Sequence, residues 1–182
     1  SLARIDVSEL DKRLAGCRID VACDVTNPLT GPQGATAVFG PQKGATAEMI
    51  ASLDNALAHF ADIIHRDLQR DVRHLEGGGA AGGMGAGLYA FCGAKLRPGI
   101  EIVTDALHLA DIVADADLVI TGEGRIDSQT VHGKVPVGVA RVAKRYNLPV
   151  IGIAGSLTAD VGVVHQHGLD AVFSVIYSIC TL

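Results

Sequence analysis

The sequence predicts an α/β fold built around a parallel sheet, because apolar strand-like segments alternate with helical ones over its last third. The strand-like segments cover residues 118–121, 149–153 and 171–176, and the helical patterns cover 136–145 and 158–167. Connections this short imply right-handed crossovers and therefore parallel strands. Ligands bind such sheets outside the carboxyl ends of the strands, so function is expected in the segments that follow each strand.

Composition restricts the class of protein. The 182 residues are 48% hydrophobic, which supplies a buried core and excludes a disordered chain. The longest apolar runs are far too short to span a membrane. The net charge is −5 and no basic run exceeds Lys144-Arg145, so the basic surface of a nucleic-acid-binding protein is missing. A few local cations would still suffice to bind small anionic molecules.

The cysteines indicate a reducing compartment. Cys17, Cys23, Cys92 and Cys180 show no Cys-x-x-Cys spacing and stand among apolar neighbours. This pattern favours packed, reduced thiols over disulfides or zinc ligands. We therefore expect a cytoplasmic protein.

The first half of the chain contains one clear strand and one clear helix. Residues 19–23 are typical of a strand, whereas residues 24–44 carry three prolines and four glycines and predict a long irregular connection. Such connections are uncommon unless they serve a function. From Thr46, a favourable N-cap, apolar residues recur at helical spacing as far as Ile64.

A glycine-rich run occupies residues 77–87. Gly77, Gly79 and Gly82 formally satisfy the GxGxxG spacing of dinucleotide-binding proteins, but residues 71–76 are too polar for the buried strand that should precede it. We favour a turn followed by a helix of small residues that lets two backbones pack closely, with anion binding at the helix N-terminus as an added role. A nicotinamide-dependent oxidoreductase that uses these glycines stays open as an alternative.

The segment 122–134, directly after the strand-like segment 118–121, has the composition of a site. Glu123 and Asp127 offer hard oxygen ligands suited to Mg²⁺, or a base for a substrate hydroxyl. Lys134 and Arg125 are suited to neutralising phosphate oxygens. His132, in the same segment, is a candidate substrate contact. The alternative is a solvated turn whose charges pair with each other; a P-loop is excluded, because GxxxxGK[ST] is missing.

A second group of polar residues follows the strand-like segment 19–23. Asp24 and Asn27 are suited to binding a polyol or a metal, and equally to bracing a turn. Lys43 adds a cation in the same connection, with a solvated turn as its alternative. The composition of this segment leaves both interpretations open.

Several of these segments together resemble a known family. The motifs are Ala22-Cys23-Asp24-Val25-Thr26-Asn27-Pro28-Leu29-Thr30-Gly31, Val38-Phe39-Gly40-Pro41-Gln42-Lys43-Gly44, Gly77-Gly78-Gly79-Ala80-Ala81-Gly82-Gly83-Met84, and Thr121-Gly122-Glu123-Gly124-Arg125-Ile126-Asp127 through Gly133-Lys134. Their order and content resemble the successive motifs of the type I glycerate kinases of bacteria, with similarity along nearly all of the chain.

The resemblance implies an activity and a domain organisation. The activity is ATP-dependent phosphorylation of D-glycerate with Mg²⁺ as cofactor, giving a phosphoglycerate, with 2-phosphoglycerate favoured. Family members have a Rossmann-like α/β domain that is discontinuous in sequence and a second α/β domain inserted into it. On that pattern residues 1–114 would be part of the inserted domain, and residues 115–182 part of the discontinuous one.

The chain departs from the family at both ends. The N-terminal segment and the C-terminal end of complete members have no counterpart here, so we expect a partial chain that is inactive until the missing segments of the same protein are supplied. The resemblance points to ten residues, and their individual roles are our inference. We expect Glu123, Asp127 and Lys134 to be catalytic, with the two carboxylates as metal ligands, and the substrate or nucleotide contacts to be Asp24, Asn27, Lys43, Gly77, Gly78, Gly79 and Arg125. Two rival interpretations stay open, a non-catalytic α/β module that binds a sugar acid and a purely structural fragment.

Overall fold

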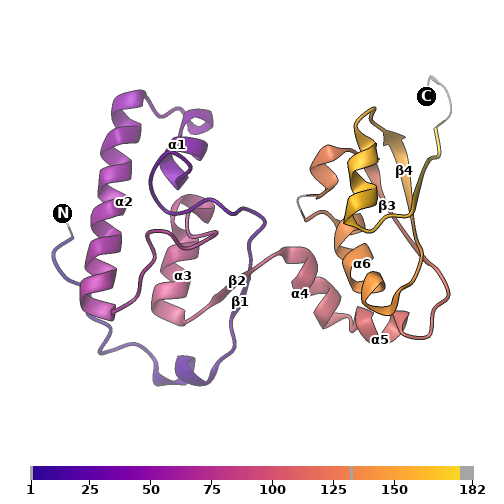
Figure 1. Ribbon diagram of the computed structural model, residues 1–182. Coiled ribbons are helices and arrows are strands. Elements are labelled where there is room, and N and C mark those ends of the chain that lie inside the picture. Colours follow the sequence, from indigo (N-terminus) through magenta and orange to yellow (C-terminus); the bar gives the residue numbers. More distant parts are fainter. Residues whose placement is uncertain (1, 132, 177–182) are drawn as a thin grey trace. The chain divides into compact units, whose positions relative to one another are not determined.

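The computed structural model describes residues 2–131 and 133–176, and it divides into two compact units, residues 1–99 and 100–182 (Figure 1). Both units combine helices with parallel strands, which confirms the predicted α/β fold. Helix α5 (Leu109–Val113) buries Val113 in the core of the second unit. That these units are pieces of an inserted and a discontinuous domain stays a prediction.

The first unit is organised by the long helix α2 (Ala47–Leu68), which confirms the helix predicted from periodicity. The side-chain oxygen of Thr46 caps it by accepting a hydrogen bond from the Met49 amide at 3.3 Å. Ala61 and Ile64 of α2 and two alanines of helix α3 (Met84–Cys92) belong to one buried cluster. The predicted strand 19–23 is β1 (Asp20–Ala22), which pairs in parallel with β2 (Lys95–Arg97).

The connection 24–44 is more regular than predicted. It contains helix α1 (Ala35–Phe39) and the 3-10 helix η2 (Pro41–Lys43), and a further 3-10 helix, η1 (Lys12–Gly16), precedes β1. Ala35 and Thr36 are buried, and α1 lies against α2 in Figure 1. Tertiary packing thus stabilises a helix of five residues that would be marginal alone.

The glycine-rich run forms a turn followed by a helix of small residues, the arrangement favoured from its sequence. The turn ends in the 3-10 helix η3 (Ala80–Gly82), and α3 follows. A Cβ atom at Gly79 would overlap the Pro28 carbonyl oxygen, and one at Gly85 would overlap the Gly77 carbonyl. Residues 71–76 include no strand, so the geometry of a dinucleotide fingerprint does not form here.

The second unit is a three-stranded parallel sheet in the order β3-β4-β5. Its strands are β3 (Val119–Ile126), β4 (Val150–Leu157) and β5 (Ala171–Ser174). Strand β3 extends five residues past the predicted end at residue 121, because Glu123, Arg125 and Ile126 pair in register with β4. The residues predicted to form a loop after the strand are therefore partly in it.

Helices connect these strands, as the alternating pattern requires. Helix α6 (Val135–Ala143) and the 3-10 helix η5 (Lys144–Tyr146) confirm the helix predicted at 136–145. The helix predicted at 158–167 is instead the 3-10 helix η6 (Val161–His167). Its β-branched valines and Gly162 lower the propensity of this segment for the α-helix.

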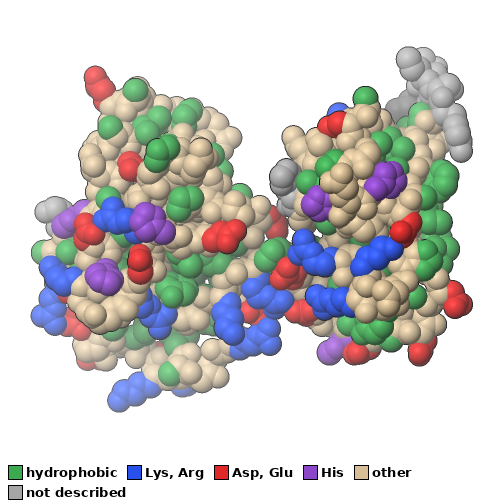
Figure 2. Space-filling view, viewed as in Figure 1, with side chains coloured by type: hydrophobic (Ala, Val, Ile, Leu, Met, Phe, Trp, Pro, Cys, Tyr) green, Lys and Arg blue, Asp and Glu red, His purple; other side chains and the backbone are tan. Residues whose placement is uncertain are grey.

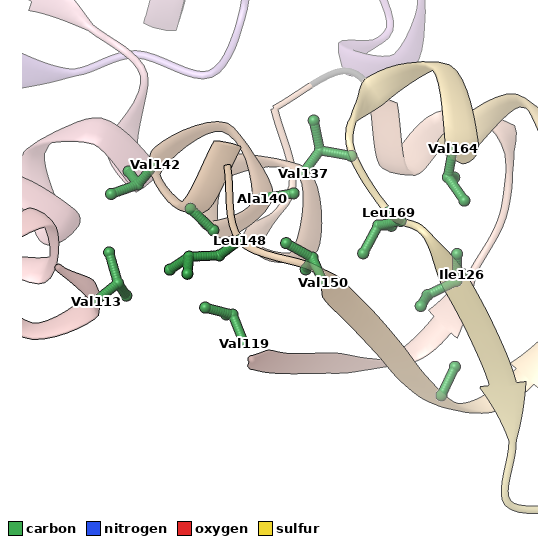
Figure 3. Close-up of a cluster of buried hydrophobic side chains, with 12 residues drawn as sticks. Val113, Val119, Ile126, Val137, Ala140, Val142, Leu148, Val150, Val164 and Leu169 are labelled. Atoms are coloured by element: carbon green, nitrogen blue, oxygen red, sulfur yellow. The ribbon is translucent and has the colours of Figure 1, made fainter. Parts of the chain in front are cut away.

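The core of the second unit lies between the sheet and its helices. Figure 3 shows Val150 of the sheet below Ala140 of α6, and Val119 near Val113 and Leu148. Helix α4 (Gly99–Ala106) approaches α6 so closely that a Cβ atom at Gly138 would overlap the side chain of Ile100. Gly138 therefore sets the distance between these two helices.

The opposite face of this sheet carries exposed apolar side chains. Ile120, Ile153 and Phe173 are 61%, 39% and 54% exposed, and Ile153 and Phe173 are neighbours in the β4–β5 pairing. Figure 2 shows hydrophobic side chains along the side of the unit where Figure 1 places the sheet. Within the described residues, no helix has the length and apolarity needed to cross a bilayer. Cys17, Cys23 and Cys92 are free cysteines, but Cys17 is exposed, so the prediction of a packed thiol is wrong there. Cys180 lies outside the described residues.

Leu169 tests this account of the core. Its side chain is fully buried, and Leu169→Ala is expected to destabilise the second unit by about 2–5 kcal/mol through lost burial and an unfilled cavity. The matched change Leu107→Ala, at a position 63% exposed, should cost within about 0.5 kcal/mol. Hydrogen exchange of the β4 amides measures both, and equal effects of the two changes would contradict the assignment of the core.

Candidate active site

The carboxyl ends of β3 and β4 meet at one edge of the parallel sheet. The two strands stay in register as far as the pair Ile126 and Leu157. Strand β3 then leads into the 3-10 helix η4 (Ser128–Val131), and α6 follows with Lys134 as its N-cap. Residues from β3, η4 and the start of α6 are therefore held close together by the main chain.

Five side chains gather at this edge, and we call them the edge cluster: Glu123, Arg125, Asp127, Thr130 and Lys134. Lys134 Nζ lies 3.4 Å from Asp127 Oδ1, and Arg125 Nε lies 3.6 Å from Asp127 Oδ2. The Asp127 side chain is only 17% exposed, whereas those of Lys134 and Arg125 are 39% and 64% exposed. The cluster thus has a sheltered carboxylate and two cations that solvent still reaches.

Thr130 connects the two carboxylates of the edge cluster. Its side chain is fully buried, and its Oγ1 lies 2.6 Å from Glu123 Oε1 and 3.4 Å from Asp127 Oδ1. The same oxygen accepts a hydrogen bond from the Asp127 amide at 3.1 Å. The structure therefore brings together the four charged residues, Glu123, Arg125, Asp127 and Lys134, that sequence composition singled out after the strand.

The protonation state of Asp127 follows from its partners. Desolvation raises the pKa of the Asp127 carboxyl, but the hydrogen bond and charge of Lys134, the Gln129 amide and the charge of Arg125 together lower this pKa below its ordinary value. The Gln129 amide donates to Asp127 Oδ1 at 2.9 Å. Asp127 is therefore ionised at neutral pH and presents an oxygen ligand or acceptor.

Sequence reasoning missed Asp160, a further carboxylate near this edge. It follows β4 as Asp127 follows β3, and helices η4 and η6 lie in contact. The neighbouring Ser128 side chain lowers the pKa of the Asp160 carboxyl below its ordinary value. The signal that would have found it is its position just beyond the carboxyl end of the second strand.

The donor set of the edge cluster fits Mg²⁺. Among the described residues no group of three or more His, Cys, Asp or Glu side chains is placed to hold a metal ion. Mg²⁺ is nevertheless commonly bound by one or two carboxylates, with water and substrate phosphate oxygens as its other ligands. Glu123 and Asp127, each with a carboxylate oxygen within 3.4 Å of the Thr130 hydroxyl oxygen, provide such a pair.

The residues predicted in the first unit are engaged in bracing its loops. Asp24 Oδ1 accepts a hydrogen bond from the Gly99 amide at 2.8 Å. Asn27 Nδ2 donates a hydrogen bond to the Gln33 carbonyl at 2.9 Å, and the main-chain carbonyl of Asn27 accepts one from the Gly79 amide, also at 2.9 Å. Both residues therefore brace loops, which is one of the two interpretations that the sequence left open. That Asp24 and Asn27 also contact a ligand stays a prediction.

The glycines predicted to bind a ligand are interior positions. Gly77, Gly78 and Gly79 are buried, and the Gly78 amide donates to the Leu75 carbonyl. Their contact with a nucleotide or substrate stays a prediction.

Lys43 lies in a different setting, at the rim of a hollow. The hollow has a volume of about 580 Å³ and is lined largely by apolar side chains of α1 and α2, among them Phe39, Met49 and Leu53. Ligand binding by Lys43 stays a prediction. His132, predicted as a substrate contact, lies outside the described residues.

Comparison with known proteins identifies a family that this chain matches. The Glycerate kinase family matches residues 1–182. The chain is 65% identical over 182 residues to a protein of Escherichia coli (strain K12) named Glycerate 2-kinase, covering 100% of this chain and 48% of that protein. It is 61% identical over 175 residues to the Glycerate kinase of Bacillus subtilis (strain 168), covering 96% and 46%.

A solved structure agrees with these relatives. A crystal structure from Salmonella typhimurium LT2, provisionally named glycerate kinase 2, superposes with a TM-score of 0.82 at 75% identity, covering all of this chain and 46% of that one. The chain thus spans about half the length of the relatives that it matches. A match over its whole length shows that the chain belongs to the glycerate kinase family.

Proposed function

We propose that a polypeptide containing this sequence transfers the γ-phosphoryl group of ATP to D-glycerate, and that 2-phosphoglycerate is the product. One observation carries the proposal: two carboxylates and two cations meet at the carboxyl edge of a parallel sheet. That is where α/β proteins bind ligands, and phosphoryl transfer depends on positioning and charge neutralisation. The names of the relatives support glycerate as the substrate and, for the Escherichia coli protein, the 2-position.

The roles of the edge cluster follow from its charges. Lys134 and Arg125, both partly exposed, would offset negative charge on phosphate or on the glycerate carboxylate. Glu123 and Asp127 would hold Mg²⁺, which when bound neutralises phosphate oxygens. Either carboxylate could instead orient the glycerate hydroxyl and accept its proton. The lowered pKa of Asp127 keeps it ionised, which suits a metal ligand, but it also makes this carboxylate a weaker proton acceptor. Asp24, Asn27, Lys43 and the glycines at 77–79 remain our candidates for further substrate or nucleotide contacts.

We further propose that the 182-residue chain alone does not turn over glycerate and that the protein is cytoplasmic. The proposal that the chain alone is inactive rests on its length, which is about half that of its relatives.

The missing half can be supplied by a chimera, in which these 182 residues replace the matching segment of the Escherichia coli relative.

The chimera tests the function directly. With ATP, Mg²⁺ and D-glycerate it should release ADP in a coupled assay and give 2-phosphoglycerate by phosphorus NMR, whereas the 182-residue chain alone should release none. The Escherichia coli protein is the positive control. A folded chimera that binds glycerate without releasing ADP would overturn the proposal in favour of a non-catalytic sugar-acid-binding module.

Asp127 is the carboxylate at the centre of the edge cluster. In the chimera Asp127→Asn should lower kcat by roughly 10²–10⁴-fold if this carboxylate accepts the proton of the glycerate hydroxyl. The control Asp117→Asn changes an exposed carboxylate just before the opposite end of β3 and should leave kcat unchanged. Undiminished turnover of the Asp127→Asn chimera would remove Asp127 from the reaction.

Lys134 is the cation held closest to Asp127. Lys134→Ala should weaken binding of nucleotide or glycerate by roughly 1.5–3 kcal/mol, or about 10- to 150-fold, because a charged hydrogen bond is lost. Isothermal titration measures both dissociation constants. The control Arg145→Ala removes an exposed positive charge beyond the other end of α6. If Lys134→Ala leaves both constants at the control's values, the role assigned to Lys134 is wrong.

A further inference from the structure

Thr130 has a buried hydroxyl that is surrounded by three hydrogen-bonding groups. Its residue is 0% exposed, in the middle of η4. Three groups lie within reach of its hydroxyl: the Glu123 carboxylate at 2.6 Å, the Asp127 amide at 3.1 Å and the Asp127 carboxylate at 3.4 Å. Because the residue is fully buried, its hydroxyl cannot bond to solvent, and among the described residues it bonds only to these groups.

The number of protons decides how these bonds are shared. A threonine hydroxyl has one proton to donate and lone pairs that accept. The Asp127 amide can only donate, so Oγ1 accepts there, and its single proton must go to a carboxylate oxygen. The 2.6 Å distance to Glu123 is typical of a charge-assisted bond between a hydroxyl and a carboxylate, whereas 3.4 Å to Asp127 is long.

The Thr130 hydroxyl bonds to both acidic residues, but in different ways. Glu123 is held through its side chain, and Asp127 is held through its main chain, which the Thr130 amide also reaches by donating to the Asp127 carbonyl at 3.0 Å. Because Glu123 belongs to β3 and Thr130 to η4, the hydroxyl joins the strand to the turn that follows it. The hydroxyl therefore links the Glu123 side chain to the main chain of Asp127. The Asp127 carboxylate is held in addition by the Gln129 amide and by Lys134.

We propose that Thr130 is a positioning residue for phosphoryl transfer: its hydroxyl holds Glu123 and Asp127 in the arrangement that binds Mg²⁺ and orients the substrate. The inference rests on the proposed function. Side chains that orient ligands of a metal site commonly contribute about 10- to 100-fold in metal affinity or activity. Thr130 itself contacts neither metal nor substrate in this account.

Two substitutions separate the hydroxyl from the bulk of the side chain. Thr130→Val keeps the shape and removes the hydroxyl, whereas Thr130→Ser keeps the hydroxyl. In the chimera, Thr130→Val should lower kcat by about 10- to 100-fold and raise the Mg²⁺ concentration needed for half-maximal rate, with the KM for glycerate nearly unchanged. Thr130→Ser should restore most of both.

Thr104→Val is the matched control. Thr104 is buried in the same unit, and its hydroxyl donates to the Glu101 carbonyl of its own helix at 3.1 Å. This change removes a buried threonine hydroxyl away from the edge cluster and should leave kcat and the Mg²⁺ dependence as they were.

A readout without metal or substrate completes the test. In the 182-residue chain, hydrogen exchange at the Asp127 amide should speed up in Thr130→Val and stay slow in Thr130→Ser, while the β4 amides stay protected in both. The inference is overturned if Thr130→Val keeps the activity and Mg²⁺ dependence of the parent chimera, or if Thr130→Ser is equally impaired. An inactive parent chimera would overturn the proposed function itself, and this role of Thr130 with it.

Discussion

The in-register pairing of β3 with β4 is the constraint on which the rest of the second unit depends. Because the two strands are parallel and stay paired as far as Ile126 and Leu157, both end at the same edge of the sheet. Asp127 and Asp160 each follow a strand at that edge, and the buried Thr130 hydroxyl ties the first of these turns back to Glu123 in the strand. The core cluster that includes Ile126, Val137 and Val164 packs beneath this edge. The β3–β4 pairing therefore both positions the edge cluster and forms part of the hydrophobic core.

The elements with strong periodicity could be predicted from the sequence, and those stabilised by tertiary contacts could not. Helix α2 combines a Thr46 cap with an apolar face of many turns, and the strands of the second unit alternate with helices, so both follow from local pattern. The end of β3 does not, because Gly122, Glu123 and Gly124 have the composition of a loop and become strand only by pairing with β4. Helix α1 is another such case, since Ala35 and Thr36 gain their burial from the surrounding fold.

The candidate site divides in the same way. The charged residues after the strand were visible as a cluster of carboxylates and cations in a short segment, and the structure does bring Glu123, Arg125, Asp127 and Lys134 together. The importance of Thr130 was invisible, because nothing in its neighbours along the chain distinguishes a buried threonine from an exposed one. In the first unit, Asn27 and Gly79 show how a motif that resembles a binding loop also serves to pack one backbone against another.

The central claim is that the edge cluster meets the transferred phosphoryl group. The most direct measurement is a crystal structure of the chimera with D-glycerate, Mg²⁺ and a non-hydrolysable ATP analogue. The account predicts Lys134 or Arg125 within hydrogen-bonding distance of a phosphate or the glycerate carboxylate, and a carboxylate of Glu123 or Asp127 on the metal or on the glycerate hydroxyl. Both ligands bound elsewhere, with these side chains facing only water, would contradict it.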